Sequence, residues 1–320
     1  MSTNFFTLVE DQISQVEVLM KAQVNGHHPH LQVVLEHLVS SGGKRVRPAV
    51  ALLTGGMLHA DGDRLLKLAG SIEMLHTATL VHDDLIDGSL LRRGIPTLNA
   101  QWSPAATVLA GDYIFARAAA MAAQTDSIDV MQLFAETLAT IVNGEIIQMF
   151  TSRGIASRED YYQRIYAKTA SMFVLATESA ALLGGVDDDV VLAVRQYGYE
   201  IGMAFQIVDD ILDFTGSQSA VGKPVASDLR QGLVTLPAIY YQESHPDDED
   251  MAAVLRGEYN HDARMMRLVA AIRASGAIKK ALDEAREFVE RGLKMLENIP
   301  DSIERQALFE IGSYIVDRDV

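Results

Sequence analysis

Cysteine is missing from this chain of 320 residues, and tryptophan occurs only once. The lack of cysteine excludes a disulfide framework, a thiolate metal site and a cysteine nucleophile, and it fits a reducing compartment. Basic residues are also scarce, because 27 Lys and Arg stand against 43 Asp and Glu, which gives a formal net charge of −16. A surface this acidic argues against nucleic acid as a partner, since phosphate backbones are bound by clustered cations.

Proline is absent from residues 105–223, although the whole chain has eight. Because a proline inside a helix costs about 3 kcal/mol, this gap permits several long consecutive helices. Apolar residues recur there at helical spacing, and strand-like alternation is hard to find. No linker rich in proline or serine divides the chain. We therefore predict an all-α fold in a single domain, residues 1–320, with roughly a dozen helices.

Capping residues and turn-forming clusters predict where some helices begin and end. Helix starts are expected at Ser103-Pro104, at Ser157–Asp160 and at Asp187–Asp189. Clusters of glycine, proline and asparagine predict loops at residues 41–43, 88–99 and 216–224.

Long uninterrupted apolar runs are also lacking. The most apolar stretch, around residues 170–186, contains Glu178. No segment is therefore predicted to cross a membrane. The first residues show neither a signal-peptide nor a transit-peptide pattern, so the expected location is the cytoplasm.

Two short acidic motifs lie inside apolar, helix-like sequence. Each has the form Asp-Asp-x-x-Asp, and together they contain Asp83, Asp84, Asp87, Asp209, Asp210 and Asp213. On a helix, residues i and i+4 share a face and residue i+1 lies beside them. Three carboxylates placed this closely repel one another unless a cation neutralises them.

Carboxylate oxygens are ligands for a hard divalent cation such as Mg²⁺. One such motif alone is explained equally well by a solvated acidic face. Two motifs flanked by apolar sequence favour a site where several Mg²⁺ ions are held, and Mg²⁺ usually completes its shell with substrate phosphates. We therefore expect a diphosphate substrate.

Basic residues stand near both motifs and in a glycine-rich turn. The turn has the sequence Gly-Gly-Lys-Arg-Val-Arg-Pro at residues 42–48, and glycines there permit close approach of a phosphate to backbone N–H groups. Each cation alone has an ordinary explanation, such as an exposed turn or a salt bridge, and His76 is as well explained as a buried structural histidine. The cations considered are Lys44, Arg47, Arg92, Arg93, Lys168 and Lys223.

This combination resembles the trans-isoprenyl diphosphate synthases, the polyprenyl synthetase family, and is most like its long-chain octaprenyl, heptaprenyl and solanesyl types. The resemblance rests on residues 83–87 followed by Arg92-Arg93-Gly94, and on the run Phe-Gln-Ile-Val-Asp-Asp-Ile-Leu-Asp at 205–213. Further similar blocks are residues 42–48, 111–113, 144–148, 168–170 and 222–224. The resemblance implies the type I isoprenoid synthase fold, with helices around a central cavity, and a homodimer.

The resemblance also implies a reaction and residue roles. Isopentenyl diphosphate and an allylic diphosphate would be joined head to tail, with several Mg²⁺ ions bridged by the allylic diphosphate. All six aspartates would bind metal, and Asp83, Asp84, Asp87, Lys168, Thr169 and Gln206 would act in catalysis. The allylic diphosphate would contact Arg92, Lys168 and Lys223, and isopentenyl diphosphate would contact Lys44, Arg47, His76 and Arg93.

The residues before the first motif are expected to set product length. Ala78 and Thr79 are small where short-chain members of the family carry a bulky aromatic floor, and small residues at Ala116, Ala118, Ala119 and Ala120 would leave a path open before Met121. We expect an all-trans product of six to ten units for a quinone side chain, released with a transient membrane contact. A geranylgeranyl product is the alternative.

Other readings share parts of the pattern. A cyclase or head-to-head synthase would not need Lys44, Arg47 and His76, and it usually replaces the second aspartate motif. A non-catalytic subunit of a heteromeric synthase would be expected to lose aspartates, and all six are present. A helical scaffold that binds divalent cations leaves the basic residues unexplained.

Two positions depart from the family pattern. Leu233 stands where many relatives have a lysine, so one diphosphate contact would be missing or supplied by Arg230. The last residues, 317–320, are less basic than is usual, which puts closure of the tail over the substrate in question. The histidines at 27, 28 and 30 are interpreted as a polar loop between helices and not as a metal site.

Overall fold

The computed structural model describes residues 5–23, 32, 43–92, 94–150, 154, 156–216, 225–258 and 261–318, and most of them are helical. This confirms the all-α fold. In the described part, the one sheet is a two-stranded hairpin of β1 (Leu91–Arg92) and β2 (Ile95–Pro96). It lies in the segment 88–99 that was predicted to be a loop, where Gly94 adopts a φ of +77° that suits glycine.

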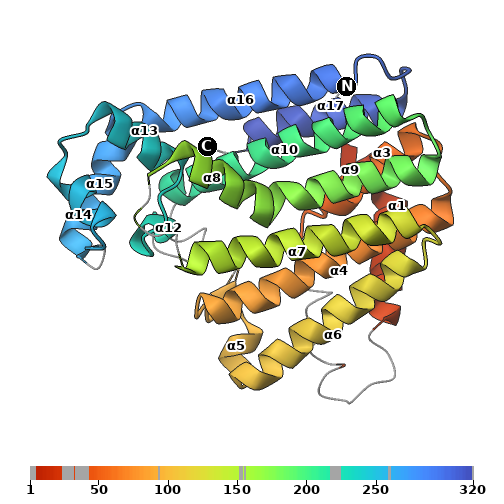
Figure 1. Cartoon of the computed structure of the whole chain (residues 1–320), viewed down its shortest axis with the longest axis horizontal. Coiled ribbons are helices and arrows are strands. Elements are labelled where there is room, and N and C mark those ends of the chain that lie inside the picture. The colour runs from red at the N-terminus through yellow and green to blue at the C-terminus, as the bar shows by residue number, and fades with distance from the viewer. Residues whose placement is uncertain are drawn as a thin grey trace. The chain divides into compact units, whose positions relative to one another are not determined.

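The helices carry the labels of Figure 1. They are α1 (Phe5–Ala22), α3 (Val46–Met57), α4 (Gly62–Ile86), α5 (Leu98–Gln101), α6 (Pro104–Ala123), α7 (Ile128–Phe150), α8 (Arg158–Ile165), α9 (Ser171–Gly184), α10 (Asp188–Thr215), α12 (Ser227–Arg230), α13 (Leu236–Ser244), α14 (Glu249–Leu255), α15 (Asp262–Ala274), α16 (Ala277–Met295) and α17 (Ile303–Val316), with a π-helical turn, η1 (Tyr166–Ala170), between α8 and α9.

Two predicted caps are present. The Ser103 hydroxyl accepts a hydrogen bond from the backbone N–H of Ala106 at 3.3 Å, and Pro104 occupies the first turn of α6. The Ser157 hydroxyl accepts from the backbone N–H of Asp160 at 3.5 Å at the start of α8. Each cap satisfies an N–H that has no partner within its helix.

The chain forms two compact units, and each is assembled from separate stretches of sequence. Unit 1 comprises residues 1–136, 172–198 and 296–311, and unit 2 comprises residues 137–171, 199–295 and 312–320. The boundaries fall inside α7, α10 and α17, one residue into α9, and at the end of α16. The single domain stays a prediction.

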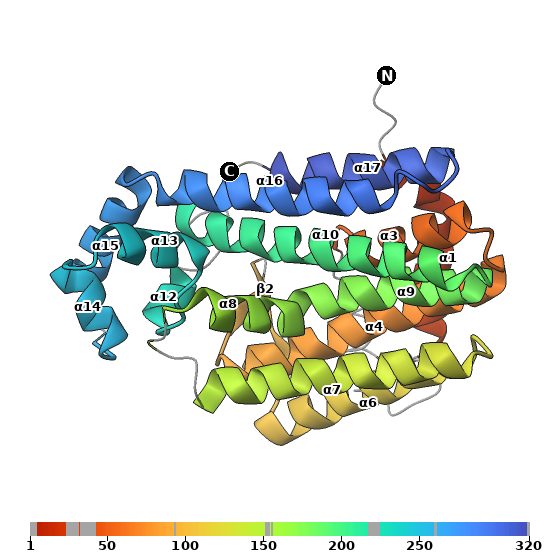
Figure 2. The same cartoon turned by 45° about the horizontal axis from the view of Figure 1, so that its top comes forward.

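Unit 1 is built on α4, which packs along α6 and also contacts α1 and α3. Figures 1 and 2 both show α4 and α6 side by side. Two glycines permit this close packing, because a Cβ on Gly111 would lie 2.2 Å from the His82 ring and a Cβ on Gly70 would lie 2.4 Å from the Met121 methyl. A larger residue at either position would therefore have to displace the His82 ring or the Met121 side chain.

Unit 2 contains a helical layer in which α13 packs on α8, α15 and α16. Glu284 on α16 accepts hydrogen bonds from the hydroxyl groups of Tyr162 on α8 and Tyr240 on α13. The Glu284 carboxylate thus links α8 and α13 to α16. Burial, together with the hydrogen bond to Glu284, raises the pKa of Tyr240 to about 12. Figure 2 shows α13 to α15 grouped at one end of α16.

The most apolar segments differ in exposure. Residues 171–177 of α9 are buried, whereas α7 exposes Val142, Ile146, Met149 and Phe150. Within the described residues, α7 is the one helix that is long and apolar enough to cross a membrane, with a mean hydropathy of 1.2 over its best window. Core helices of water-soluble proteins can pass the same test, so α7 is not a clear membrane span.

Candidate functional site

Both aspartate motifs lie at the C-terminal ends of long helices. Asp83 and Asp84 are in the last turn of α4 and Asp87 directly follows it, while Asp209, Asp210 and Asp213 occupy the last two turns of α10. Neither helix has a basic residue in its own last turn. Negative charge is unfavourable at a helix C-terminus, where the macrodipole is already negative. Three carboxylates at each end therefore indicate sites that receive cations.

In unit 1, Asp84 is buried and fixed by Arg92 of the hairpin. Arg92 Nε donates to both carboxylate oxygens at 3.0 Å, and Nη2 donates to Oδ1 at 2.9 Å. The salt bridge that was the ordinary explanation for Arg92 is therefore present. Asp83 is half-buried and Asp87 is exposed, so these two carboxylates are the more accessible members of the motif.

The basic turn before α3 divides its residues between two roles. Arg47 Nη1 lies 3.3 Å from Nε2 of His76, and its guanidinium lies 5.3 Å from the centre of the Phe173 ring. The structure thus brings together two residues that were predicted to bind isopentenyl diphosphate. Lys44 is exposed in the same turn.

Arg45, between Lys44 and Arg47, turns into unit 1 instead. Its backbone has a φ of +48°, which is costly for a residue with a side chain. Its guanidinium contacts Glu17 on α1 at 3.2 Å and the buried Glu73 on α4 at 2.5 Å. Burial alone would lower the pKa of Arg45, but the two carboxylates outweigh it and the pKa is raised. Arg45 is therefore an internal ion-pair partner.

In unit 2, Asp210 is the most enclosed aspartate of the second motif. Its Oδ2 accepts from the Tyr161 hydroxyl at 2.7 Å, and its Oδ1 accepts from the Gln206 amide nitrogen at 2.8 Å. Burial, with the nearby Asp228 carboxylate, raises the pKa of Asp210 to about 8, although the two hydrogen bonds oppose that rise.

The other two aspartates of this motif have different partners. The Asp213 carboxylate accepts from the backbone N–H groups of Ser227 and Asp228 at 3.1 and 3.2 Å, which caps α12. Asp209 Oδ1 lies 2.9 Å from Nη1 of Arg318, whose guanidinium also stacks 4.2 Å from the Phe205 ring centre. The tail that was expected to be weakly basic thus places one arginine on a predicted metal ligand.

The π-helical turn η1 carries Lys168 and Thr169. Such turns interrupt α-helices at functional sites more often than elsewhere. A Cβ on Gly144 of α7 would lie 2.5 Å from the Cβ of Ala167, so glycine permits this turn to approach α7. Lys168 Nζ lies 3.1 Å from Oε1 of Glu145, and the Thr169 hydroxyl donates to Gln206 Oε1 at 2.5 Å.

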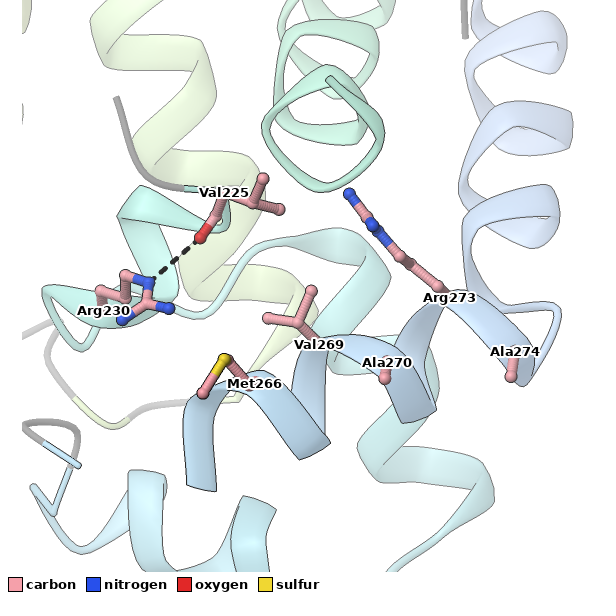
Figure 3. Close-up of a pocket in the computed structure, with 7 residues that line it drawn as sticks. All are labelled: Val225, Arg230, Met266, Val269, Ala270, Arg273 and Ala274. Carbon is pink, nitrogen blue, oxygen red and sulfur yellow. Dashed lines mark hydrogen bonds between the residues drawn. The ribbon is translucent and has the colours of Figure 1, made fainter. Parts of the chain in front are cut away.

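Arg230 was considered as a substitute for the lysine that Leu233 replaces. Arg230 Nε donates to the carbonyl oxygen of Val225 at 3.1 Å, and Nη1 donates to Asp262 at 2.8 Å. Figure 3 shows the first of these bonds at a pocket of about 520 Å³ whose opposite wall is α15. These contacts join Arg230 to Val225 and to Asp262 within unit 2, and its role in place of the missing lysine stays a prediction.

The predicted chain-length residues lie inside unit 1. Ala78 is fully buried and Thr79 is 8% exposed. On α6, Ala118 and Met121 are buried, but Ala116 is exposed. That Ala116 borders the path for the product stays a prediction.

Some predicted residues fall outside the described part of the chain. They are Gly42, Arg93, Lys223 and the histidines at 27, 28 and 30. Sequence reasoning also missed several residues that contact predicted ones, namely Glu145, Tyr161, Asp228 and Arg318. Only Glu145 had a local signal, since it follows Gly144 in a block typical of the family.

Metal fit can be judged from the donors. Among the described residues, no three acidic or histidine side chains come together closely enough to form a ready cation cage. Mg²⁺ does not need one, since it usually binds one or two carboxylates and completes its shell with water and substrate phosphates. Accessible carboxylate pairs one turn apart, such as Asp83 with Asp87, fit that requirement.

Comparison with known proteins gives a consistent picture. A family model described as polyprenyl synthetase matches residues 28–272. Component 2 of the heptaprenyl diphosphate synthase of Geobacillus stearothermophilus is 34% identical over 315 residues, covering 98% of each chain. The octaprenyl diphosphate synthase of Haemophilus influenzae is 32% identical, covering 98% of this chain and 95% of its own.

A solved structure is also similar along the whole length. The polyprenyl synthase from Caulobacter crescentus, complexed with calcium and isoprenyl diphosphate, superposes with a TM-score of 0.93 at 34% identity, covering 99% of this chain and 98% of its own.

Proposed function

Because the chain belongs to the polyprenyl synthetase family and is thus an enzyme that transfers prenyl groups, we propose that it condenses isopentenyl diphosphate with an allylic diphosphate to make a long all-trans polyprenyl diphosphate. The resemblance inferred from motifs is thereby confirmed at the level of the family. The observation that carries the finer proposal is the placement of an aspartate motif at the C-terminal end of both α4 and α10.

The proposed cofactor is Mg²⁺, with several ions per site. Bound Mg²⁺ would neutralise the negative charge that builds up on the departing diphosphate. We assign direct contact to the accessible carboxylates Asp83, Asp87, Asp209 and Asp213. Asp84 and Asp210 are buried and hydrogen-bonded within their own units, so they would support the metal site from behind. The Caulobacter relative, which holds calcium with isoprenyl diphosphate, agrees with a divalent cation.

The proposed substrate contacts are basic side chains that would pair with the negative charges of the two diphosphates. Arg92, Lys168 and Lys223 would bind the allylic diphosphate. Lys44, Arg47, His76 and Arg93 would bind isopentenyl diphosphate, and the 3.3 Å contact between Arg47 and His76 supports a shared anion site. Arginine forks and lysine point charges are the usual ligands of diphosphates.

Breaking the allylic C–O bond leaves a carbocation that water would capture, so the reacting carbons need a dry surface. Thr169 is 3% exposed, so it is shielded from water. The dipoles of the Thr169 hydroxyl and the Gln206 amide are proposed to stabilise the cation. Neither group is a strong nucleophile in this arrangement. The isopentenyl double bond therefore remains the attacking group. After the new C–C bond forms, the proton lost from the isopentenyl unit is proposed to pass to the released diphosphate.

The proposed product is six to ten units long and serves as a quinone side chain. A growing chain would run along α4 from Asp83 toward Gly62, a distance of about 31 Å at 1.5 Å per residue. That length accepts about six extended units of about 5 Å each. The two named relatives make seven- and eight-unit chains by their names, and a geranylgeranyl product remains the alternative.

The proposed assembly is a homodimer in the cytoplasm. On α7, Val142, Ile146, Met149 and Phe150 are spaced at i, i+4, i+7 and i+8 and are 41–77% exposed together with Ile147. An apolar stripe of this spacing on one helix is typical of a surface that packs on another subunit. A transient membrane contact would receive the long product.

One experiment tests the proposal. The purified single chain is incubated with labelled isopentenyl diphosphate, farnesyl diphosphate and Mg²⁺, and the dephosphorylated products are separated by chromatography. We expect a ladder ending at six to ten units and no product after chelation. No elongation would contradict the proposal, and activity that appears only with a second protein would instead support the heteromeric arrangement that the name component 2 implies for the Geobacillus relative.

A further inference from the structure

Four side chains of unit 2 form one continuous hydrogen-bonded series. The Tyr161 hydroxyl donates to Asp210, Asp210 accepts from the Gln206 amide nitrogen, and the Gln206 amide oxygen accepts from the Thr169 hydroxyl. The three contacts measure 2.7, 2.8 and 2.5 Å. Tyr161, on α8, is fully buried, and Asp210 and Thr169 are 4% and 3% exposed.

The chemistry of the donors gives this series a direction. Asp210 Oδ2 accepts from the Tyr161 hydroxyl and Asp210 Oδ1 accepts from the amide nitrogen of Gln206, so the amide oxygen faces Thr169 and accepts from its hydroxyl. The hydroxyl hydrogen of Thr169 is then committed to Gln206. The lone pairs of that hydroxyl oxygen consequently point away from the series and stay available to a neighbouring group.

We propose that Tyr161 is a positioning residue that acts through Asp210 and Gln206 to hold the lone pairs of Thr169 toward the developing allylic cation. This inference rests on the proposed function. A threonine hydroxyl turned the other way would present its hydrogen, the positive end of its dipole, and would raise the barrier to ionisation.

The hydrogen-bond contact of Tyr161 suits it to this role. It donates to Asp210, an aspartate of the second motif, and it is linked to Thr169 through two intervening residues, Asp210 and Gln206. A buried hydrogen bond from a neutral donor to a carboxylate is strong enough to fix one arrangement of the amide. Without it, Asp210 is free to rotate and Gln206 loses its fixed orientation.

The test is a double-mutant cycle between Tyr161→Phe and Thr169→Val. Both replacements keep the shape of the side chain and remove one hydroxyl. The matched control is Tyr241→Phe, since Tyr241 also donates to an aspartate, Asp248, at 2.7 Å but is a residue of α13 outside the series. For every variant we would measure kcat, KM for both diphosphates, the Tm, and Mn²⁺ affinity by electron paramagnetic resonance.

We expect Tyr161→Phe to lower kcat about tenfold, the size of one hydrogen bond to a charged group, while both KM values stay within about twofold. In the Thr169→Val background the same change should lower kcat by less than about twofold, because no hydroxyl is left to orient. Mn²⁺ affinity should be unchanged, and Tyr241→Phe should have wild-type kcat.

Several outcomes would overturn the proposal. Equal losses of kcat in both backgrounds would mean that Tyr161 acts independently of Thr169. A weaker Mn²⁺ affinity in Tyr161→Phe would mean that its carboxylate partner serves the metal instead. An equal loss in Tyr241→Phe would indicate a general effect on the fold. An inactive wild-type chain would refute the proposed function together with this inference, whereas an active wild type with additive losses refutes the inference alone.

Discussion

Replacing small residues along one face of α4 should shorten the product in steps that the helix geometry sets. Ala78 lies five residues before Asp83 and Ser71 lies twelve residues before it, and both are fully buried. At 1.5 Å per residue, these positions are about 7.5 and about 18 Å from the first motif. Seven residues correspond to a rotation of about 700°, so the two side chains lie within about 20° of the same face.

We expect Ala78→Tyr to stop elongation about two units earlier than Ser71→Tyr. The two positions are about 10.5 Å apart along α4, and an extended isoprene unit is about 5 Å long. Both products should be shorter than that of the wild type. The first condensations should continue, because neither change touches an aspartate. Chromatography of the dephosphorylated products measures both lengths.

Ala69→Tyr is the matched control. Ala69 is also fully buried on α4, but it lies nine residues from Ala78 and therefore about 180° around the helix. Overpacking should cost all three variants about 1–3 kcal/mol, so their Tm values should fall by similar amounts. If Tyr at position 78 prevents folding, the flexible side chain of Ala78→Met keeps the measurement possible.

Equal product lengths from Ala78→Tyr and Ser71→Tyr would refute a path along α4, because such a path requires the two lengths to differ. The path is also contradicted if Ala69→Tyr shortens the product as much as Ala78→Tyr, since the effect would then come from destabilisation and not from the face of the helix.

Further outcomes follow from the contacts of the charged residues. Asp83→Ala should lower turnover by more than about a hundredfold, because it removes a proposed Mg²⁺ ligand. Its Tm should hold or rise, because the change removes a negative charge at a helix C-terminus. Near-normal turnover at limiting Mg²⁺ would contradict the proposed role. Lys44→Ala and Arg47→Ala should raise KM for isopentenyl diphosphate more than for the allylic substrate, and equal effects would show that the anion sites are wrongly divided. Arg318→Gln should tighten Mn²⁺ binding about threefold to tenfold in the substrate-free protein, since the guanidinium competes for Asp209; an unchanged affinity in a Mn²⁺ titration would refute the competition. Phe150→Asp should shift the chain toward monomer in sizing experiments at several concentrations, as expected when a charge enters an apolar interface, and an unchanged elution volume would exclude that surface.

Much of the fold could be predicted because its signals are local. Helical spacing, a long proline-free stretch and the capping serines Ser103 and Ser157 involve residues within a few positions of one another. The same local rules do not distinguish η1 from an ordinary helical turn, and its approach to α7 involves Gly144 and Ala167, which are far apart in sequence. The hairpin at 91–96 was read as a loop, since two-residue strands have no period to detect.

The site was predictable where a motif is contiguous and was missed where a partner is distant. The aspartates form visible repeats, whereas Tyr161 and Arg318 are 49 and 109 residues from the aspartates that they contact. The basic turn shows the limit most clearly. Arg45 and Arg47 are two residues apart and chemically identical, yet a left-handed backbone at Arg45 turns only that side chain toward Glu17 and Glu73. No sequence pattern distinguishes their roles.

The interleaving of the two units has a consequence for synthesis on the ribosome. Unit 1 begins with the first helix but is complete only with residues 296–311, and a bond from the Tyr197 hydroxyl to the carbonyl oxygen of Leu308 at 2.9 Å ties that late segment to an earlier one. Unit 2 likewise receives residues 312–320 last. A nascent chain must therefore wait through nearly its whole translation with α4 and α10 incompletely covered, at a speed of about 5–20 residues per second. No single cut in the chain places the two units on separate pieces, because each unit is assembled from three stretches that alternate along the sequence.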